Sequence, residues 1–166
     1  PFPWPGWSSS PPPCWSWAAR PGSISRWKRS PGWNLSREKA RWIAGQVDPE
    51  TLVIGADTVV VRDGEILGKP KGEEEARAML ASLSGRTHQV CTGVTVCRGD
   101  KVLTQVEETQ VTFRPLTDQE IRQYVSTGES MDKAGAYGIQ GRGALFVAHL
   151  DGDYFNVMGL PLCPLC

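Results

Sequence analysis

The chain has 166 residues, with 18 basic and 18 acidic side chains and five cysteines. Its formal net charge is zero, so no global charge signal points to a nucleic acid or a membrane surface. No run of about eighteen apolar residues is present that could span a bilayer. Length and composition therefore predict a soluble protein of one domain, and reduced thiols favour a cytoplasmic location.

Residues 1–34 differ in composition from everything that follows. They hold six of the seven Trp and eight of the thirteen Pro, and the chain has no Asp or Glu before Glu38. The run Pro11-Pro12-Pro13 resists both helix and strand, and no periodicity is visible. Three interpretations stand: a Trp-rich ligand-binding arm, a disordered tail, and coding sequence read in the wrong frame. We favour the third, and Pro1 without a basic n-region predicts no secretory signal.

The first regular elements are expected directly after this segment. Ser36 is an N-cap candidate for a short helix over Arg37–Gly45. The apolar residues 51–56 predict a buried strand. A hairpin is then expected across Asp63-Gly64, because a tight type I′ turn needs positive φ at both central positions.

The middle of the chain carries further helix and hairpin signals. Apolar residues recur at helical spacing over Gly72–Ser84, and Gly85 supplies the stop. A long hairpin is predicted between His88–Cys97 and Lys101–Phe113. The sequence Thr117-Asp118-Gln119-Glu120 is a capping-box pattern that predicts a further helix.

The last predicted element is a hairpin across Asp151-Gly152-Asp153. It pairs Ala144–Leu150 with Tyr154–Met158. The alternation of helices and hairpins is typical of an α/β protein.

One acidic side chain is a candidate for metal binding or proton transfer. Asp57 closes the apolar run that ends at Ala56, and a carboxylate held at the end of a buried strand is well placed to bind a metal or take a proton. A glycine-rich polar run, Lys133–Gly141, follows several elements later. The alternative for Asp57 is that it caps a turn.

These residues belong to a set of motifs that resembles a known family. The motifs are Lys39-Ala40, Ala56–Val60, Gly68–Pro70, Leu83–Val90, Thr92–Val94, Lys133–Gly141 and Gly159–Leu162. Their order and spacing resemble those of the Maf family of nucleoside triphosphate pyrophosphatases, and the resemblance covers Leu35–Leu162.

The resemblance implies an activity and a fold. It implies hydrolysis of a nucleoside triphosphate between the α and β phosphates, with a divalent metal cation, Mg²⁺ or Mn²⁺. Asp57-Thr58 together with Ile139-Gln140-Gly141 resembles the branch that acts on dTTP and UTP. The implied fold is α/β, with a mixed central sheet, flanking helices and two lobes around a substrate cleft. The family also implies a homodimer, with a nucleotide rather than a nucleic acid or a membrane as its partner.

The resemblance also implies roles for particular residues. Asp57 matches the proton acceptor and could equally bind the metal. Thr58 and Gln140 match positions that set base preference, and an amide can both donate to and accept from the imide edge of uracil or thymine. Without the resemblance, Thr58 is a β-former and Gln140 a turn residue.

The implied phosphate-binding cations are Lys69 and Lys133, with Arg86 in a similar role. Surface lysines are often only solvated, and Arg86 could instead cap a helix C-terminus. Lys39 falls at a family position, although it could also be a helix-surface residue.

Two further titratable residues are weaker candidates. Glu129 is either a second carboxylate near the cleft or a solvent-facing acid. His88 has no paired His or Cys nearby, which favours a structural role over metal binding.

The N-terminal segment departs from the family pattern. Maf proteins open with a strand and Ser-x-Ser-Pro-Arg-Arg, whereas here Ser8-Ser9-Ser10-Pro11 leads into two more prolines. We therefore expect a Maf-like domain over 35–166 that lacks its first strand. Two hypotheses follow: a dTTP/UTP pyrophosphatase, and a catalytically impaired nucleotide-binding or regulatory protein linked to septum formation.

Overall fold

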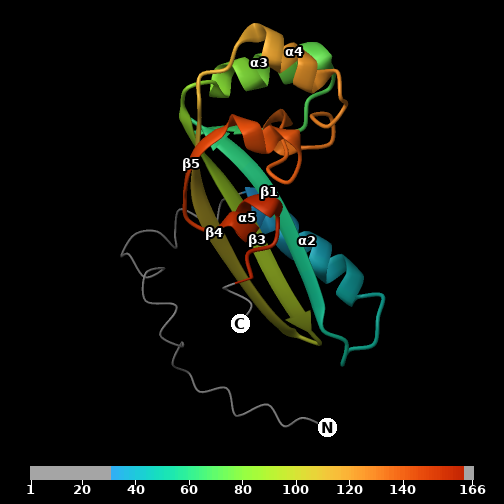
Figure 1. Ribbon diagram of the computed structural model, residues 1–166. Coiled ribbons are helices and arrows are strands. Elements are labelled where there is room, and N and C mark those ends of the chain that lie inside the picture. Colours follow the sequence, from blue (N-terminus) through green and yellow to red (C-terminus); the bar gives the residue numbers. More distant parts are fainter. Residues whose placement is uncertain (1–30, 163–166) are drawn as a thin grey trace.

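The computed structural model describes residues 31–162, which form one antiparallel sheet with helices on both faces and at one end (Figure 1). The strand order is β2-β1-β3-β4-β5. In chain order the elements are α2 (Pro31–Ala44), β1 (Val53–Arg62), β2 (Glu65–Leu67), α3 (Glu73–Leu83), β3 (Thr87–Arg98), β4 (Lys101–Phe113), α4 (Asp118–Val125), η2 (Ala134–Ala136), η3 (Arg142–Phe146), β5 (Val147–Asp151) and α5 (Tyr154–Met158).

The α/β class is confirmed, but the sheet is not the mixed sheet that the sequence predicted. Every pairing between the described strands is antiparallel. Two of the four neighbouring pairs, β1 with β2 and β3 with β4, are tight hairpins, and a hairpin can join only antiparallel strands. Asp63 and Gly64 both have positive φ, as the predicted turn requires.

Helix α2 lies directly against the sheet because glycines face it. A Cβ on Gly55 would come within 2.7 Å of the Ser36 carbonyl oxygen, and one on Gly93 would overlap the carbonyl of Gly32. The helix begins at Pro31, before the predicted start at Arg37. Ser36 is therefore an internal residue rather than an N-cap, and its Oγ donates to the Trp33 carbonyl at 3.1 Å. Serine is small enough for this close contact.

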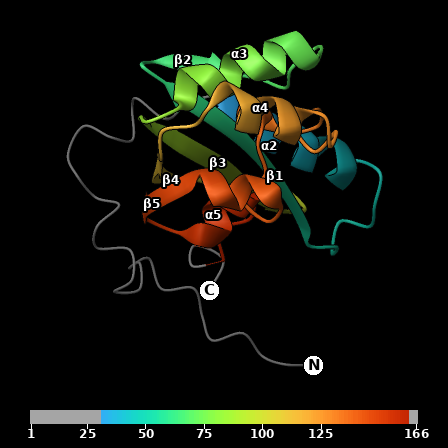
Figure 2. The same ribbon diagram turned by 45° about the horizontal axis from the view of Figure 1, so that its top comes forward.

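The helices α3 and α4 and the 3-10 turns form a second lobe at one end of the sheet (Figure 2). Leu80 and Leu83 of α3, Phe113 of β4 and Val125 of α4 are almost fully buried in its core. Helix α4 begins with the predicted capping box: the Thr117 side chain accepts from the backbone of Glu120, whose carboxylate accepts from the backbone of Thr117. The two-lobed arrangement is the one that the sequence predicted.

The last predicted hairpin is wrong. Residues 154–158 form helix α5 instead of a strand, and β5 pairs with β4. The Asp153 carboxylate caps α5 by accepting from Phe155 N at 2.8 Å. The buried Asn156 side chain then donates to the carbonyl of Val90 at 3.0 Å and to Thr109 Oγ1 at 2.8 Å. These contacts hold α5 on the face of the sheet opposite α2.

The structure includes the last residues of the segment whose composition is atypical. Residues 31–34, which the sequence assigned to the atypical segment, form the first turn of α2. The predictions for residues 1–30 lie outside the described residues. Within the described part of the chain, no helix is long and apolar enough to cross a membrane.

Candidate functional site

A cavity of about 260 Å³ lies where β1 meets the second lobe and α5. Four residues that the sequence singled out line it: Asp57, Thr58, Lys69 and Lys133. The fold thus brings together residues that are up to 76 positions apart in the chain. The other lining residues are Ala56, Val60, Val90, Asp132, Ala134, Tyr137, Ile139, Val157 and Met158.

Asp57 sits in the middle of β1, not at the strand end that the sequence predicted. Its carboxylate forms an ion pair with the ammonium group of Lys39, which projects from α2. The Asp57 side chain is only 16% exposed, whereas that of Lys39 is 57% exposed. Lys39 is therefore a direct partner of the candidate base, and the close packing of α2 on the sheet places it there.

Thr58 points to the opposite face of the sheet from Asp57, because side chains alternate along a strand. Its hydroxyl lies 2.9 Å from the hydroxyl of Thr92, its register partner on β3. Thr92 in turn donates to the carbonyl of Asn156 at 2.8 Å. A buried chain of hydrogen bonds thus fixes the Thr58 side chain between the sheet and α5.

The two candidate phosphate-binding lysines lie on segments that are tied together. Gly135 N donates to the carbonyl of Gly68 at 3.0 Å, which holds the Lys69 and Lys133 segments side by side. Lys133 Nζ contacts both oxygens of Asp132 at 2.9 Å. The hydrogen bond and charge of Lys133 lower the pKa of Asp132, and the charge of Lys69 adds to the effect.

Asp132 is a cavity residue that the sequence reasoning missed. Its only sequence signal was its position beside Lys133 in the polar run before the glycines.

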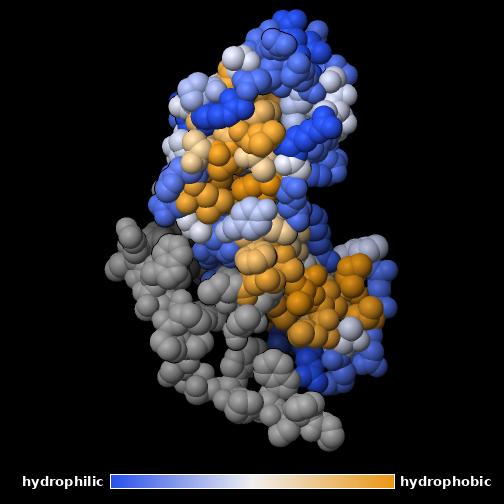
Figure 3. Space-filling model, in the orientation of Figure 1, coloured by the Kyte–Doolittle hydropathy of each residue, from blue (hydrophilic) through white to orange (hydrophobic). Residues whose placement is uncertain are grey.

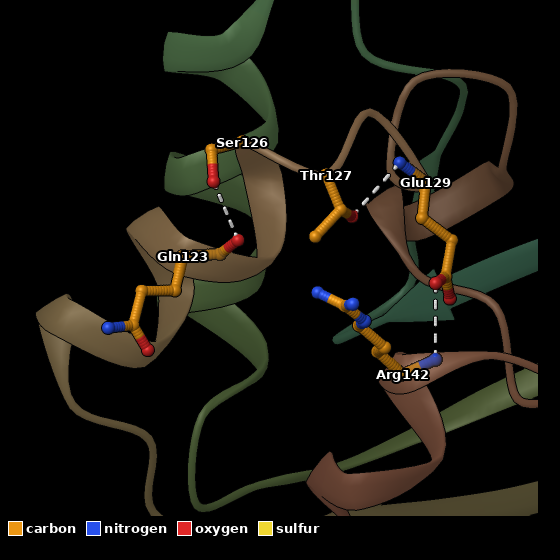
Figure 4. A pocket seen from close by; sticks show the side chains of 5 residues that line it. All are labelled: Gln123, Ser126, Thr127, Glu129 and Arg142. Atoms are coloured by element: carbon orange, nitrogen blue, oxygen red, sulfur yellow. Dashed lines mark hydrogen bonds between the residues drawn. The ribbon is translucent and has the colours of Figure 1, made fainter.

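Gln140 and Glu129 do not line this cavity. Gln140 is exposed, although its neighbour Ile139 is a lining residue. Glu129 belongs to a second, open groove of about 740 Å³ together with Gln123, Ser126, Thr127 and Arg142 (Figure 4). It is half-buried, not simply solvent-facing.

Arg86 and His88 do not line the cavity either. The Arg86 guanidinium forms an ion pair with Asp63 at 2.7 Å, beside the β1–β2 turn. His88 Nε2 lies 2.8 Å from the hydroxyl of Tyr137 in the core, and burial lowers the pKa of His88 to about 4. A neutral, packed histidine fits the structural role that the sequence favoured.

The cavity suits a divalent cation that is bound partly by protein carboxylates and partly by the phosphates of a substrate. Within residues 31–162, no group of three or more His, Cys, Asp or Glu side chains is arranged so that it could hold a metal ion by itself. Two aspartates, Asp57 and Asp132, are among the residues that line the cavity. Mg²⁺ commonly binds through one or two carboxylates, with water and substrate phosphates as its remaining ligands. The donor set therefore fits Mg²⁺ or Mn²⁺ bound together with a nucleotide.

Within this antiparallel α/β fold, the residues that line the cavity include two aspartates and two lysines, and lysine is a side chain that commonly binds phosphate groups. The family model for Maf-like proteins matches residues 27–166, and the chain therefore belongs to the Maf family.

Three relatives illustrate the similarity, and each is named dTTP/UTP pyrophosphatase. The one from Bacillus pumilus (strain SAFR-032) is 55% identical over 78% of this chain and 72% of its own length. The one from Symbiobacterium thermophilum is 57% identical, over 77% of this chain and 66% of its own length. The one from Geobacillus sp. (strain WCH70) is 58% identical, over 77% and 68% respectively. The chain thus spans about two thirds of the length of these relatives.

Proposed function

We propose that the chain hydrolyses dTTP and UTP to the nucleoside monophosphate and pyrophosphate. The observation that carries this proposal is the cavity itself. It is lined by an aspartate, a threonine and two lysines at motif positions of the family, and the named relatives share half or more of their aligned residues with this chain.

Asp57 is the proposed proton acceptor. A water molecule attacks the α-phosphorus and its proton passes to the Asp57 carboxylate, while the bond between the α-phosphorus and the bridging oxygen breaks and pyrophosphate leaves. The ion pair with Lys39 holds the carboxylate in one orientation. Orientation matters because a base must lie within hydrogen-bond reach of the proton that it removes.

Lys69 and Lys133 are the proposed partners of the phosphate chain. Two ammonium groups beside the cavity offset the charge that develops on the leaving pyrophosphate. Asp57 and Asp132 are the residues that would hold Mg²⁺ or Mn²⁺. When bound, the cation polarises the phosphoryl oxygens and offsets negative charge.

Base preference is assigned to Thr58 and Gln140. Thr58 is immobilised by Thr92, so its hydroxyl is a fixed polar group beside the cavity. Gln140 follows Ile139, which lines the cavity, and its amide offers a donor and an acceptor to a pyrimidine imide. The catalytically impaired alternative is not favoured, because the relatives are named as enzymes.

The test is pyrophosphate release from dTTP and UTP with Mg²⁺. Asp57→Asn keeps the side-chain shape but removes the base, so the rate should fall at least about 10²-fold while the thermal unfolding midpoint changes little. The matched control is Asp63→Asn, an exposed aspartate beyond the end of the same strand and outside the cavity. Equal rates for the two variants would remove Asp57 from the mechanism, and no release by the unaltered chain would refute the function.

A further inference from the structure

Glu129 is the carboxylate around which the loop Gly138–Gly143 is built. Its Oε2 accepts from Arg142 N at 3.1 Å, as Figure 4 shows, and its Oε1 accepts from Gly143 N at 3.4 Å. The Arg142 side chain itself extends away from the carboxylate, toward Thr127. Among the described residues, no cationic side chain forms an ion pair with Glu129. The negative charge is therefore directed at backbone N–H groups.

Tyr124 extends this arrangement to the start of the loop. Its hydroxyl donates to Glu129 Oε1 at 3.1 Å and accepts from Gly138 N at 3.1 Å. Burial raises the pKa of Tyr124, and the charge of Glu129 contributes to the rise, so the phenol keeps its proton. The two side chains together bind the N–H groups of Gly138, Arg142 and Gly143.

Two glycines of the loop, Gly141 and Gly143, lie so close to neighbouring atoms that a side chain would not fit. A Cβ on Gly141 would overlap the Glu129 carboxylate. A Cβ on Gly143 would lie 2.6 Å from the Gly138 carbonyl oxygen and 3.1 Å from the Tyr124 hydroxyl. The loop can close around Glu129 only because these positions lack side chains.

The residues held between the anchored N–H groups of Gly138 and Arg142 are Ile139, Gln140 and Gly141. Ile139 is buried and lines the cavity that contains Asp57, whereas Gln140 is exposed beside it. Asp57 lies in β1 and Lys69 in the loop after β2, and within residues 31–162 no hydrogen bond or ion pair joins either of them to Glu129. A change at Glu129 should therefore move the Ile139-Gln140 pair and leave the candidate base in place.

We propose that Glu129 is a positioning residue for base selectivity: with Tyr124 it fixes the loop Gly138–Gly143 and so sets where Ile139 and Gln140 meet the nucleobase. This proposal rests on the proposed pyrophosphatase function. Hydrogen bonds to a charged group are stronger than those between neutral groups, so a carboxylate holds the loop more firmly than an amide.

The test compares Glu129→Gln with the unaltered chain in two measurements. The first is amide hydrogen exchange of residues 138–143 without substrate. The amide group presents an N–H where Glu129 accepts one, so exchange there should accelerate at least about tenfold while the β3 and β4 segments stay protected. The second is the ratio of kcat/KM for dTTP to that for GTP. It should fall about tenfold, through a higher KM for dTTP with little change in kcat.

Two further variants keep the test decisive. Gln123→Ala alters the same groove without touching the loop, and it should change neither measurement. Tyr124→Phe removes only the hydroxyl and should release the Gly138 end of the loop, so it replaces Glu129→Gln if that variant fails to fold. Unchanged exchange over 138–143, or faster exchange with an unchanged selectivity ratio, would overturn the proposal. Absence of pyrophosphate release by the unaltered chain would refute the proposed pyrophosphatase function. The exchange data would still decide whether Glu129 holds the loop.

Discussion

His88 is a buried titratable side chain whose neutral form the fold requires. His88 is 2% exposed, and its imidazole ring contacts the rings of Phe113 and Tyr137 edge to face. Burial lowers its pKa in the folded protein to about 4, from an ordinary value of 6.5. Between these two values the unfolded chain binds the proton and the folded chain does not. Stability is therefore full above about pH 6.5 and is lost as the pH falls toward 4, by up to about 3 kcal/mol.

This dependence is testable with the two histidines of the chain. Between pH 7 and 5, His88→Gln should lose less unfolding free energy in urea than the unaltered chain, because the variant has no imidazole to protonate on unfolding. His149→Gln is the control, because His149 is exposed on β5 and should leave the pH dependence unchanged. Identical pH profiles for all three proteins would show that His88 does not govern acid stability.

At the scale of the element, the contact of α2 with the sheet decides both stability and site geometry. Gly93→Ala places a Cβ against the Gly32 carbonyl, so α2 must shift, and overpacking of this kind typically costs about 1–3 kcal/mol. Because α2 carries Lys39, the same shift should weaken the Lys39–Asp57 pair and slow pyrophosphate release. Urea unfolding and a rate assay measure both effects.

Gly72→Ala is the matched control for that substitution. A Cβ at Gly72 meets nothing within 4 Å, and its φ of −170° is open to any residue. We expect a change within about 0.5 kcal/mol and an unaltered rate. If Gly93→Ala behaved like Gly72→Ala, the helix would not be held as closely as this packing requires.

Elements with local signals could be predicted from the sequence, and elements decided by tertiary contacts could not. The β3–β4 hairpin and the Thr117 capping box depend on neighbouring residues, and both are confirmed. The sequence of α5 predicted a strand. The helix forms instead because Asn156 makes hydrogen bonds to residues 47 and 66 positions away, which a local pattern does not reveal. The cavity residues Asp57, Thr58, Lys69 and Lys133 were found through motifs. The pairing of Glu129 with the loop is a contact through space that no motif encodes.

At the scale of the whole molecule, the β1 edge of the sheet is only partly paired within residues 31–162. On the side away from β3, β1 pairs with β2 over Val60–Arg62, and no described strand pairs with residues 53–59 on that side. Apolar side chains lie near this edge: Leu52 is 58% exposed and Ile54 is 49% exposed. Figure 3 shows hydrophobic residues gathered on the lower part of this face, beside β1 and α2. Unpaired backbone groups next to apolar surface favour pairing with another chain.

We therefore expect the chain to self-associate as its concentration rises, and we expect a charge at this edge to oppose the association. Ile54→Lys should reduce light scattering and shift sedimentation toward the monomer, because lysine on an edge strand disfavours strand addition. Leu145→Lys is the matched control: Leu145 is 71% exposed but lies in η3, away from β1. If both variants lowered association equally, general surface hydrophobicity would be responsible. A monomeric unaltered chain at every concentration would show that the β1 edge is no site of self-association.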